Sequence, residues 1–513
     1  MRKPFKVCFG PATCAVDLCD GSERGEYVNQ DYILTKLRRP HRAINLMYCY
    51  YPNDKGWPQR ASVAHAHDAA FAWDYPYDDY FPYTGGLNGS TDGPVFEQMR
   101  DIRRHGQDVC LTLTMDPFLT DEHIASVARD LRPYGRITVR INHEATGSWF
   151  SFNKRASYEE VAAFFVRACG VFHKEAPNAK IVLCLDGCKE LSERKMMMED
   201  IFTEAARAAD IVSVDRYLAL HWGWPGNVCE DARAAADYDT DDIYKLAKKS
   251  YKRYIAMNDG VKKPMVMSEL NADGDVTGPY YQAEKMKRFC DRLKADREHW
   301  LSGFTMYQFR DRGRLGLEIE DPNNPDNGIE QPILPVYRDI IQDPFFQPSR
   351  RRAGSAKLPV TLRFGGAEDF EAVCVPVALE GKPVFFEAYF DGELARENLM
   401  LEVNGTWFYK KPGVTCIDMS SAWFGCGGFC GCSFPGDLSG GDGKNTDAKT
   451  TDSAGAGEVV VTIAAPPASG ENDLSLPDGD INHYRTLTAL PRFRVRYAPI
   501  LDARKQTDFK GKC

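Results

Sequence analysis

The sequence has no long apolar run. No stretch of its 513 residues approaches the about 20 consecutive apolar residues that a membrane helix needs. The first eight residues are partly basic, but Gly10, Pro11 and Asp17 follow where a signal peptide would have its apolar segment. We therefore expect a chain that does not bind membranes and is cytoplasmic, or secreted or periplasmic if a leader was removed.

Clusters of positive charge are also missing. The net charge is -9, and lysine and arginine are scattered along the chain, so nothing suggests a surface for nucleic acid. Hydrophobic residues make up 43% and charged residues 27%, which is ordinary for a folded protein. The length exceeds what a single core usually supports, so we expect one large domain and one smaller domain.

Motifs for common cofactors are absent as well. No Gly-x-Gly-x-x-Gly follows the first predicted strand, which removes the main reason to expect a dinucleotide-binding fold. Cys426, Cys430 and Cys432, with Cys416 nearby, match no common zinc spacing, so we expect free thiols in a glycine-rich turn. We expect no metal and no organic cofactor.

Strand-like and helix-like patterns alternate through the first 346 residues, as in βα units around a parallel sheet. The strand-like runs are continuous apolar segments, which is typical of a sheet that is buried on both faces. They span residues 5–9, 43–50, 109–115, 137–141, 181–185, 211–214, 264–267 and 304–309. Eight such runs predict a (β/α)8 TIM barrel over residues 1–346.

The pattern changes after the barrel. Residues 347–356 have the composition of a linker, and short strand-like runs without helices occupy residues 357–502. We interpret this second region as an antiparallel β-sandwich accessory domain, followed by a C-terminal tail at residues 503–513. Trp407 and Trp423 could stack on sugars there, although packing in a core explains each of them as well.

Two apolar runs end on a glutamate. Residues 140–144 read Arg-Ile-Asn-His-Glu, and residues 263–269 read Lys-Pro-Met-Val-Met-Ser-Glu. Counting strands places Glu144 at the end of the fourth strand and Glu269 at the end of the seventh, where TIM barrels hold their catalytic groups. Retaining glycosidases use two carboxyl groups about 5 to 5.5 Å apart. A structural ion pair is the alternative for each glutamate taken alone.

The surrounding motifs resemble those of glycoside hydrolase family 26, in clan A of the glycoside hydrolases. The resemblance lies in Arg140-x-x-His143-Glu144, in Gly147-x-Trp149-Phe150 and in the segment that ends on Glu269. It implies a retaining hydrolase of β-glycosidic bonds, with Glu144 as general acid/base and Glu269 as nucleophile. An exo-acting clan A glycosidase on an acidic or sulfated glycan, or a catalytically silent carbohydrate-binding barrel, remains an alternative.

Further polar residues at strand ends are candidates for substrate binding. Arg140 is the natural cation to assist Glu269, and Asn142 and His143 lie beside Glu144 in sequence; a buried, hydrogen-bonded histidine is the alternative for His143. Tyr217 ends the sixth strand, where clan A enzymes often place a tyrosine against the nucleophile, although a core tyrosine is as plausible.

Two more candidates end neighbouring strands. Asp186 ends the fifth strand and could bind a sugar hydroxyl, or serve as a helix cap or ion-pair partner. Gln308 lies on the eighth predicted strand, where clan members often have tryptophan.

Aromatic residues concentrate in segments that follow strands, where they could stack on the C–H faces of sugar rings. Trp73 lies in a long segment after the second strand, Trp149 follows the fourth, and Trp222 and Trp224 follow the sixth. Such a long segment is uncommon without a function, but it could also hold a small core of its own.

Arginines follow the eighth strand. Arg310, with Arg312 and Arg314 close by, could recognise acidic groups on a glycan, and solvated ion pairs are the alternative. The expected partner is a polysaccharide or oligosaccharide substrate, with no nucleic acid and no membrane; the sequence leaves the oligomeric state open.

Overall fold

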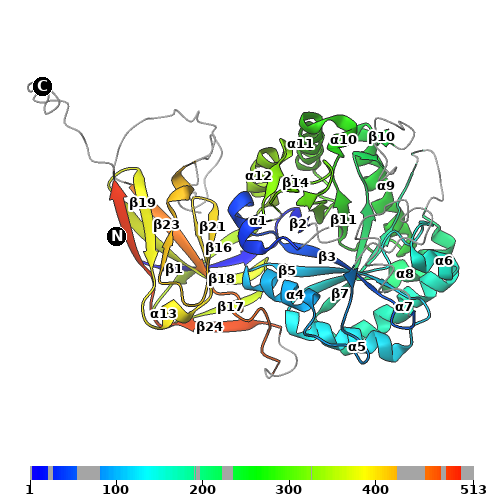
Figure 1. Ribbon diagram of the computed structural model, residues 1–513, viewed down its shortest axis with the longest axis horizontal. Coiled ribbons are helices and arrows are strands. Elements are labelled where there is room, and N and C mark those ends of the chain that lie inside the picture. Colours follow the sequence, from blue (N-terminus) through cyan, green and yellow to red (C-terminus); the bar gives the residue numbers. More distant parts are fainter. Residues whose placement is uncertain are drawn as a thin grey trace, which may run out of the picture.

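The computed structural model describes residues 3–20, 27–54, 81–189, 191, 197–221, 235–324, 326–424, 457–474 and 481–497. Figure 1 shows a barrel on the right and a group of antiparallel strands on the left.

Eight parallel strands form the closed barrel, which confirms the predicted (β/α)8 fold. Its sheet runs β2-β12-β11-β8-β7-β6-β5-β3, and the additional pairing of β2 with β3 closes it. The barrel strands are β2 (Ala15–Cys19), β3 (Ala43–Tyr50), β5 (Asp108–Met115), β6 (Ile137–Ile141), β7 (Ala179–Leu185), β8 (Ile211–Asp215), β11 (Met265–Leu270) and β12 (Gly303–Met306). Seven of the eight predicted strand runs coincide with these strands.

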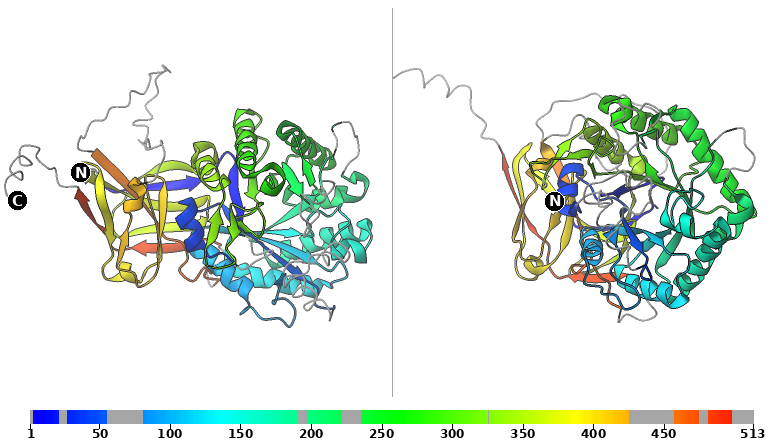
Figure 2. Two further views of the ribbon diagram at one scale, coloured as in Figure 1. Left: turned by 45° about the horizontal axis from the view of Figure 1, so that its top comes forward. Right: turned by 45° about the vertical axis from the view of Figure 1, so that its right-hand side comes forward.

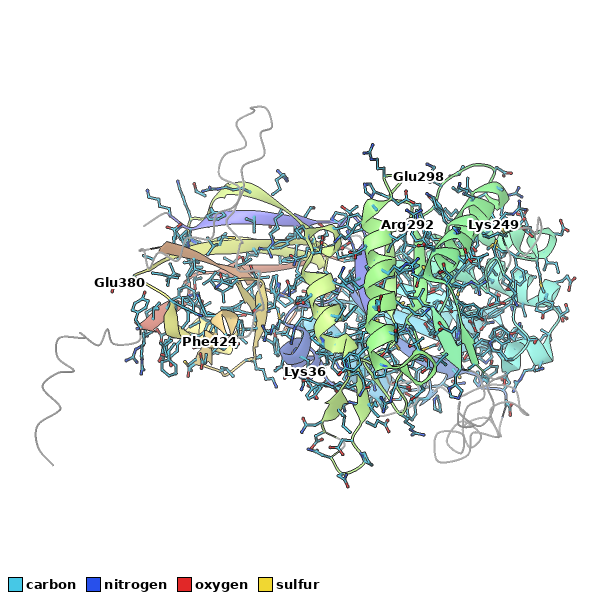
Figure 3. All side chains as sticks on the ribbon, turned by 90° about the horizontal axis from the view of Figure 1, so that it is seen from above. Lys36, Lys249, Arg292, Glu298, Glu380 and Phe424 are labelled. Carbon is cyan, nitrogen blue, oxygen red and sulfur yellow. The ribbon has the colours of Figure 1, made fainter. Side chains whose placement is uncertain are left out.

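Helices surround the barrel as a ring, as the right-hand view of Figure 2 shows. Those that follow the successive barrel strands are α1 (Gln30–Leu37), α4 (Pro94–Arg104), α5 (Asp121–Leu131), α7 (Tyr158–Glu175), α8 (Glu199–Ala208), α9 (Thr240–Met257), α11 (Pro279–Ala295) and α12 (Ile333–Gln342). Exposed charged side chains lie on the outside of this ring, for example Arg292 on α11 and Glu298 in the turn that follows it (Figure 3).

Helix α7 shows why the sequence forms these helices. Ser157 accepts from the amide of Glu160, and the Glu160 side chain accepts from the amide of Ser157, which completes a capping box. Its apolar residues, including Val161, Phe165 and Phe172, are buried against the barrel. Capping and an apolar stripe thus fix both the start and the orientation of the helix.

Short elements occupy the connections. They are β4 (Phe81–Pro82), the 3-10 turn Arg132–Tyr134, α6 (Ser151–Arg155), β9 (Ala219–His221), β10 (Ala235–Asp237), α10 (Gly274–Thr277), β13 (Arg310–Asp311), β14 (Glu318–Glu320), β15 (Gly328–Glu330) and the 3-10 turn Pro344–Phe346. Strand β9 pairs with β10, and Ala219 forms a bridge with Ala272 at the end of β11.

The first predicted strand is not a barrel strand. Residues 5–9 lie in β1 (Phe5–Gly10), which pairs with two strands of the C-terminal region, and β2 takes its place in the barrel. The burial of β1 alternates along the strand, as expected for a strand with only one buried face, whereas all residues of β2 are buried. Asp17 interrupts the apolar run of β2; it is buried because Arg42 pairs with it.

Two antiparallel sheets make up the C-terminal region. The larger contains β1 with β16 (Ser349–Ser355), β17 (Val360–Gly366), β18 (Asp369–Leu379), β20 (Leu399–Val403), β21 (Thr406–Lys410), β23 (Gly457–Ala464) and β24 (His483–Leu487). The smaller contains β19 (Pro383–Tyr389), β22 (Cys416–Asp418) and β25 (Arg492–Tyr497). The short helix α13 (Glu393–Arg396) and the 3-10 turn Ser420–Trp423 join them.

Buried residues of both sheets share one core. Phe386 of the smaller sheet packs in the same cluster as Leu401 and Val461 of the larger sheet. This shared core supports the predicted β-sandwich, which remains our interpretation. The predicted linker is wrong for residues 349–355, because they form β16 and pair with β1.

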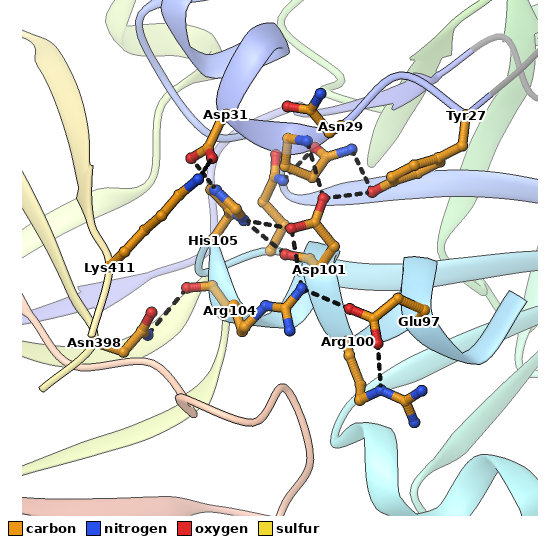
Figure 4. Close-up of polar contacts among 12 residues, drawn as sticks. Tyr27, Asn29, Asp31, Glu97, Arg100, Asp101, Arg104, His105, Asn398 and Lys411 are labelled. Carbon is orange, nitrogen blue, oxygen red and sulfur yellow. Dashed lines mark hydrogen bonds and ion pairs between the residues drawn. The ribbon is translucent and has the colours of Figure 1, made fainter. Parts of the chain in front are cut away.

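The C-terminal sheets pack against the amino-terminal ends of the barrel strands. The Asn398 side chain donates to the carbonyl of Arg104, and Lys411 pairs with Asp31, which also contacts His105 (Figure 4). Residues 104 and 105 come just before β5 in the chain. The C-terminal region therefore covers the end of the barrel that is opposite to the carboxyl ends of the strands.

Trp407 and Trp423 contribute to packing in this region. Trp407 contacts Phe9 and Phe370 edge to face, and Trp423 lies against Phe386 with ring centroids 4.8 Å apart. These contacts support the packing alternative for both residues.

The eleven cysteines among the described residues are free thiols, and Cys416 is exposed. Cys426, Cys430 and Cys432, and the tail at residues 503–513, lie outside the described residues. In the part of the chain that the structure describes, no helix combines the length and the apolar character that crossing a membrane requires.

Candidate active site

Arg140 lies at the centre of the site. It extends from β6 into the barrel, is fully buried, and donates to Asp215 through Nη1 at 3.0 and 2.9 Å and to Glu269 through Nη2 at 2.8 Å. Its Nε donates to the Thr112 hydroxyl at 2.8 Å. One guanidinium thus holds two carboxylates in place, as its planar, fixed donors allow.

Glu269 is bound through both of its carboxylate oxygens. Oε1 accepts from Arg140, and Oε2 accepts from the Tyr217 hydroxyl at 2.6 Å. The structure therefore places the predicted tyrosine against the predicted nucleophile. Burial and the charge of Asp215 raise the pKa of Glu269 to about 7, although Arg140 and Tyr217 oppose this rise.

Glu144 follows β6 and is partly exposed. Its Oε2 accepts from the indole Nε1 of Trp149 at 2.9 Å, so the two residues of the predicted motif are in contact. Desolvation, then the charges of Asp215, Glu269 and Asp186, raise the pKa of Glu144 well above its usual value. This direction is the one that a general acid needs near neutral pH.

The backbone on either side of His143 is unusual. Asn142 has a φ of 48° and Glu144 a φ of 49°, which are left-handed conformations that non-glycine residues rarely adopt. Such conformations persist where the surrounding structure enforces them, often at functional sites. Here they turn the chain sharply at the end of β6.

Asn142 and His143 are both buried beside the glutamates. Asn142 accepts from the amide of Met115 at 2.6 Å, and its Nδ2 has no hydrogen-bond partner in the described part of the chain. His143 has its Nε2 3.9 Å from Oε1 of Glu269. Burial and then Arg140 lower the pKa of His143 well below its usual value, so the imidazole is neutral.

Asp215 is a site residue that the sequence analysis did not select. It ends β8, its side chain is fully buried, and it accepts from Arg140 and from the Ser268 hydroxyl at 2.8 Å. The Cys184 thiol also donates to it, at 3.2 Å. Its position at a strand end, two residues before Tyr217, was the signal available in the sequence.

Three of these groups could be considered as ligands for a cation. One ligand atom each from His143, Asp215 and Glu269 lies within 4.8 Å of the others. However, the Arg140 guanidinium already pairs with both carboxylates and would repel a metal ion. The donor set therefore does not fit a metal site.

Two further predicted residues also lie at strand ends. Asp186 follows β7, pairs with Lys189 at 2.6 Å and lies 3.9 Å from Arg216. Gln308 follows β12 and is fully buried; its Nε2 donates to Asp311, and its Oε1 has no partner within the described ranges. Its unpaired oxygen is a possible contact for a ligand.

The arginines after β12 are engaged in ion pairs. Arg310 pairs with the buried Glu318 at 3.1 Å and lies over the ring of Tyr32. Arg312 pairs with Glu320 at 3.5 Å, and Arg314 pairs with Asp275 at 3.4 Å. These contacts support the ion-pair alternative rather than recognition of an acidic glycan.

Of the predicted aromatic residues, Trp73, Trp222 and Trp224 lie outside the described residues. Trp149 is described, and it contacts Glu144 as well as Phe150. The structure therefore brings together Arg140, Asn142, His143, Glu144, Trp149, Tyr217 and Glu269, with Asp215 added.

No family model matches this chain, and no curated protein matches it in sequence. Among solved structures, it is similar to a family 51 α-L-arabinofuranosidase, AbfB from Bifidobacterium longum, at 11% identity and a TM-score of 0.40, covering 76% of this chain and 90% of that chain.

Two further similar structures are also glycosidases by name. A family 39 glycoside hydrolase from Bacteroides cellulosilyticus has 10% identity and a TM-score of 0.41, covering 89% of this chain and 81% of that one. A β-glucosidase from Thermotoga maritima has 13% identity and a TM-score of 0.41, covering 62% and 86%. Likenesses this distant assign no activity, so the function is argued from the site.

Proposed function

We propose that the protein is a retaining glycoside hydrolase that cleaves β-glycosidic bonds of a polysaccharide or oligosaccharide. The observation that supports this most strongly is the pair of carboxyl groups at the ends of β6 and β11. Glu269 is held by a cation and a hydroxyl, whereas Glu144 has a raised pKa and accepts from the indole of Trp149. Two carboxyl groups in such different environments match the two roles of the reaction.

In the first step, a carboxylate oxygen of Glu269 attacks the anomeric carbon while Glu144 donates its proton to the departing glycosidic oxygen. The sugar becomes covalently bound to Glu269, and the first product leaves. Arg140 and Tyr217 keep the attacking carboxylate in a fixed orientation, which lowers the entropic cost of the step.

In the second step, Glu144 is ionised and takes a proton from a water molecule. That water attacks the anomeric carbon, the bond to Glu269 breaks, and Glu144 is protonated again. The charges of Asp215 and Asp186 favour this return of the proton, since both raise the pKa of Glu144.

Turnover on a panel of β-linked plant and algal polysaccharides tests the proposal. Glu144→Gln and Glu269→Gln should each lower kcat by about 10² to 10⁴ or more, because each removes a group that acts in the transition state. As a matched control, Glu298→Gln changes an exposed glutamate on the outside of the barrel and should leave kcat unchanged. Hydrolysis that persists in both active-site variants would contradict the assignment.

The stereochemistry of the product tests the mechanism separately. Proton NMR during hydrolysis should show that the sugar released first has the anomeric configuration of the substrate, as two successive displacements require. Release of the opposite anomer would indicate an inverting enzyme in which Glu269 activates water.

The alternative of a catalytically silent carbohydrate-binding barrel predicts binding without turnover. Both carboxyl groups are present, and the charge of Glu269 acts on Glu144, which favours the enzyme. An exo-acting enzyme on an acidic or sulfated glycan is disfavoured because the arginines after β12 are paired with carboxylates.

A further inference from the structure

The exposed aromatic side chains of the barrel gather at one end. Among the barrel's described residues, four aromatic side chains are exposed, namely Phe118 at 57%, Tyr238 at 39%, Tyr280 at 77% and Tyr281 at 64%. Each follows a barrel strand: β5, β8 or β11. All four therefore lie on the side of the barrel that holds the two glutamates. Exposed rings scattered at random would not share one end.

Tyr238 is tied directly to the catalytic centre through the backbone. Its amide donates to the carbonyl of Leu218 at 3.1 Å, and the amide of Leu218 donates to Asn271 at 2.7 Å. Leu218 is the next residue after Tyr217, whose hydroxyl donates to Glu269. The exposed tyrosine thus sits close to the residue that positions the nucleophile.

The segment of Tyr238 is hydrogen-bonded to α11, the helix that carries Tyr281. The Lys285 Nζ donates to the carbonyl of Tyr238 at 2.5 Å and pairs with Asp237 at 2.8 Å. Tyr281 precedes Lys285 by four residues on α11, so both occupy the same face of that helix. Figure 1 shows β10, α10 and α11 next to one another at this edge of the barrel.

Asp186 connects this pair of tyrosines to the glutamates. Desolvation raises the pKa of Tyr238, and the Asp186 carboxylate adds to the rise while Arg216 opposes it. The charge of Asp186 also acts on Glu144. Asp186 also lies 3.9 Å from Arg216, and the amide of Arg216 donates to the carbonyl of Glu269 at 2.9 Å, so this carboxylate lies beside the strand end that carries Glu269.

The chemistry of these residues suits a neutral sugar. Exposed aromatic rings stack on the C–H faces of sugar rings, and a carboxylate at their edge can accept from hydroxyl groups. The cations nearby are already paired, Lys285 with Asp237 and Lys189 with Asp186. Because both lysines are already paired, neither is available to bind the carboxylate of a sugar acid. Asp186 would also repel that carboxylate.

We propose that Tyr238, Tyr281 and Asp186 form a second sugar-binding subsite, which holds a ring of a neutral glycan chain at a distance from the bond that is cleaved. This inference rests on the proposed function and makes it more specific. The substrate is an extended chain of neutral sugars rather than a short glycoside.

The dependence of hydrolysis on chain length tests the subsite. We expect kcat/KM of the wild-type protein to rise between two and six residues in a series of cello-, manno- or xylo-oligosaccharides. Tyr238→Ala and Tyr281→Ala should each reduce this preference for the longer substrate about tenfold, because each removes a stacking ring. Tyr484→Ala is the matched control, since Tyr484 is 48% exposed but lies on β24, far from the barrel mouth.

Binding without turnover separates the subsite from catalysis. In the Glu269→Gln background, mixed-linkage β-glucan, mannan or xylan in a native gel should retard the protein. Adding Tyr238→Ala should weaken this retardation, and adding Tyr484→Ala should not.

The outcomes distinguish the two proposals. Hydrolysis that has no length preference, or that the tyrosine variants do not affect, overturns the subsite and leaves the proposed hydrolase intact. Tyrosine-dependent binding without any hydrolysis by the wild-type protein supports the subsite and overturns the hydrolase. If the tyrosine variants instead abolish dimers in analytical ultracentrifugation and leave glycan binding unchanged, the patch is an interface between two copies, and the subsite is overturned.

Discussion

At the scale of single residues, the site is organised by the electrostatics of a few buried groups. Arg140 supplies one positive charge to two carboxylates, Asp215 and Glu269, and Glu144 lies within the field of both. The total charge of this group is therefore negative, which favours the binding of protons. Burial, and then this charge, raise the pKa values of the two glutamates.

The pH dependence of activity should reflect these shifts. The nucleophile must be ionised, and the pKa of Glu269 is raised to about 7, so kcat/KM should increase as the pH rises through 7. The decrease at high pH should follow the deprotonation of Glu144, whose pKa is raised well above its usual value. A profile measured from pH 4 to pH 10 should therefore have a neutral to alkaline optimum. Full activity at pH 5 would contradict this prediction.

Removing the charge of Asp215 should move the whole profile. Asp215→Asn deletes a negative charge that raises the pKa of both glutamates, so both limbs of the pH profile should shift to lower pH, by about one pH unit. Ser268→Ala is the control, because it removes a hydrogen bond to Asp215 and leaves the charge in place. Equal shifts in the two variants would mean that the charge of Asp215 is not the cause.

At the scale of elements, each proposed catalytic group depends on the strand and helix that hold it. Strand β6 ends on the segment that contains Arg140 and Glu144, and α7, which follows, packs along β7 and α8. The position of Glu144 therefore relies on a helix whose first turn is fixed by local hydrogen bonds.

Loss of the capping box of α7 should lower stability. Ser157→Ala removes the side chain that accepts from the amide of Glu160, and the free energy of unfolding should decrease by about 1 kcal/mol. Chemical denaturation followed by circular dichroism measures this change. Ser157→Thr keeps a hydroxyl at the cap and should retain most of the stability; a loss as large as that of alanine would point to another cause.

At the scale of the whole molecule, the N-terminal strand joins the two parts of the chain. Strand β1 inserts between β16 and β18, and the ring of Phe9 stacks on Phe370 with centroids 4.2 Å apart. In sequence order, a strand of the C-terminal sheet therefore precedes all the barrel strands. The two parts are thus not successive, independent units of the sequence.

Truncation after residue 346 should therefore yield an insoluble protein. It would remove both partners of β1 and expose Phe5, Val7 and Phe9, which are buried in the complete chain. Size-exclusion chromatography of the expressed fragment tests this outcome. A chain that ends after residue 497 keeps every described element and should remain soluble. A soluble, monomeric fragment 1–346 would show that the C-terminal sheets are dispensable for folding.

Much of the barrel could be predicted because its strands are continuous apolar runs. The run at 43–50 is β3 and that at 137–141 is β6, and apolar residues predominate in both although β6 contains Arg140. Strand β2 was missed because Asp17 lies within it, and the strand is buried only because Arg42, far along the chain, neutralises that charge. Strand β1 was assigned to the barrel because an apolar run predicts a strand but does not determine which sheet that strand joins.

The candidate site was predicted to a similar extent. Glu144, Glu269 and Tyr217 were selected because each ends a strand, and Arg140 because it belongs to the motif of Glu144. Asp215 was not selected, since its importance comes from an arginine that is distant in sequence and adjacent in space.

The sequence by itself determined seven of the eight barrel strands and the carboxyl groups at the ends of two of them, because both follow from local patterns of apolar and polar residues. Only the tertiary structure decided which sheet the first strand joins and how strongly each glutamate retains its proton. These properties depend on distances between residues that are far apart in the chain, and such distances exist only after the barrel has closed.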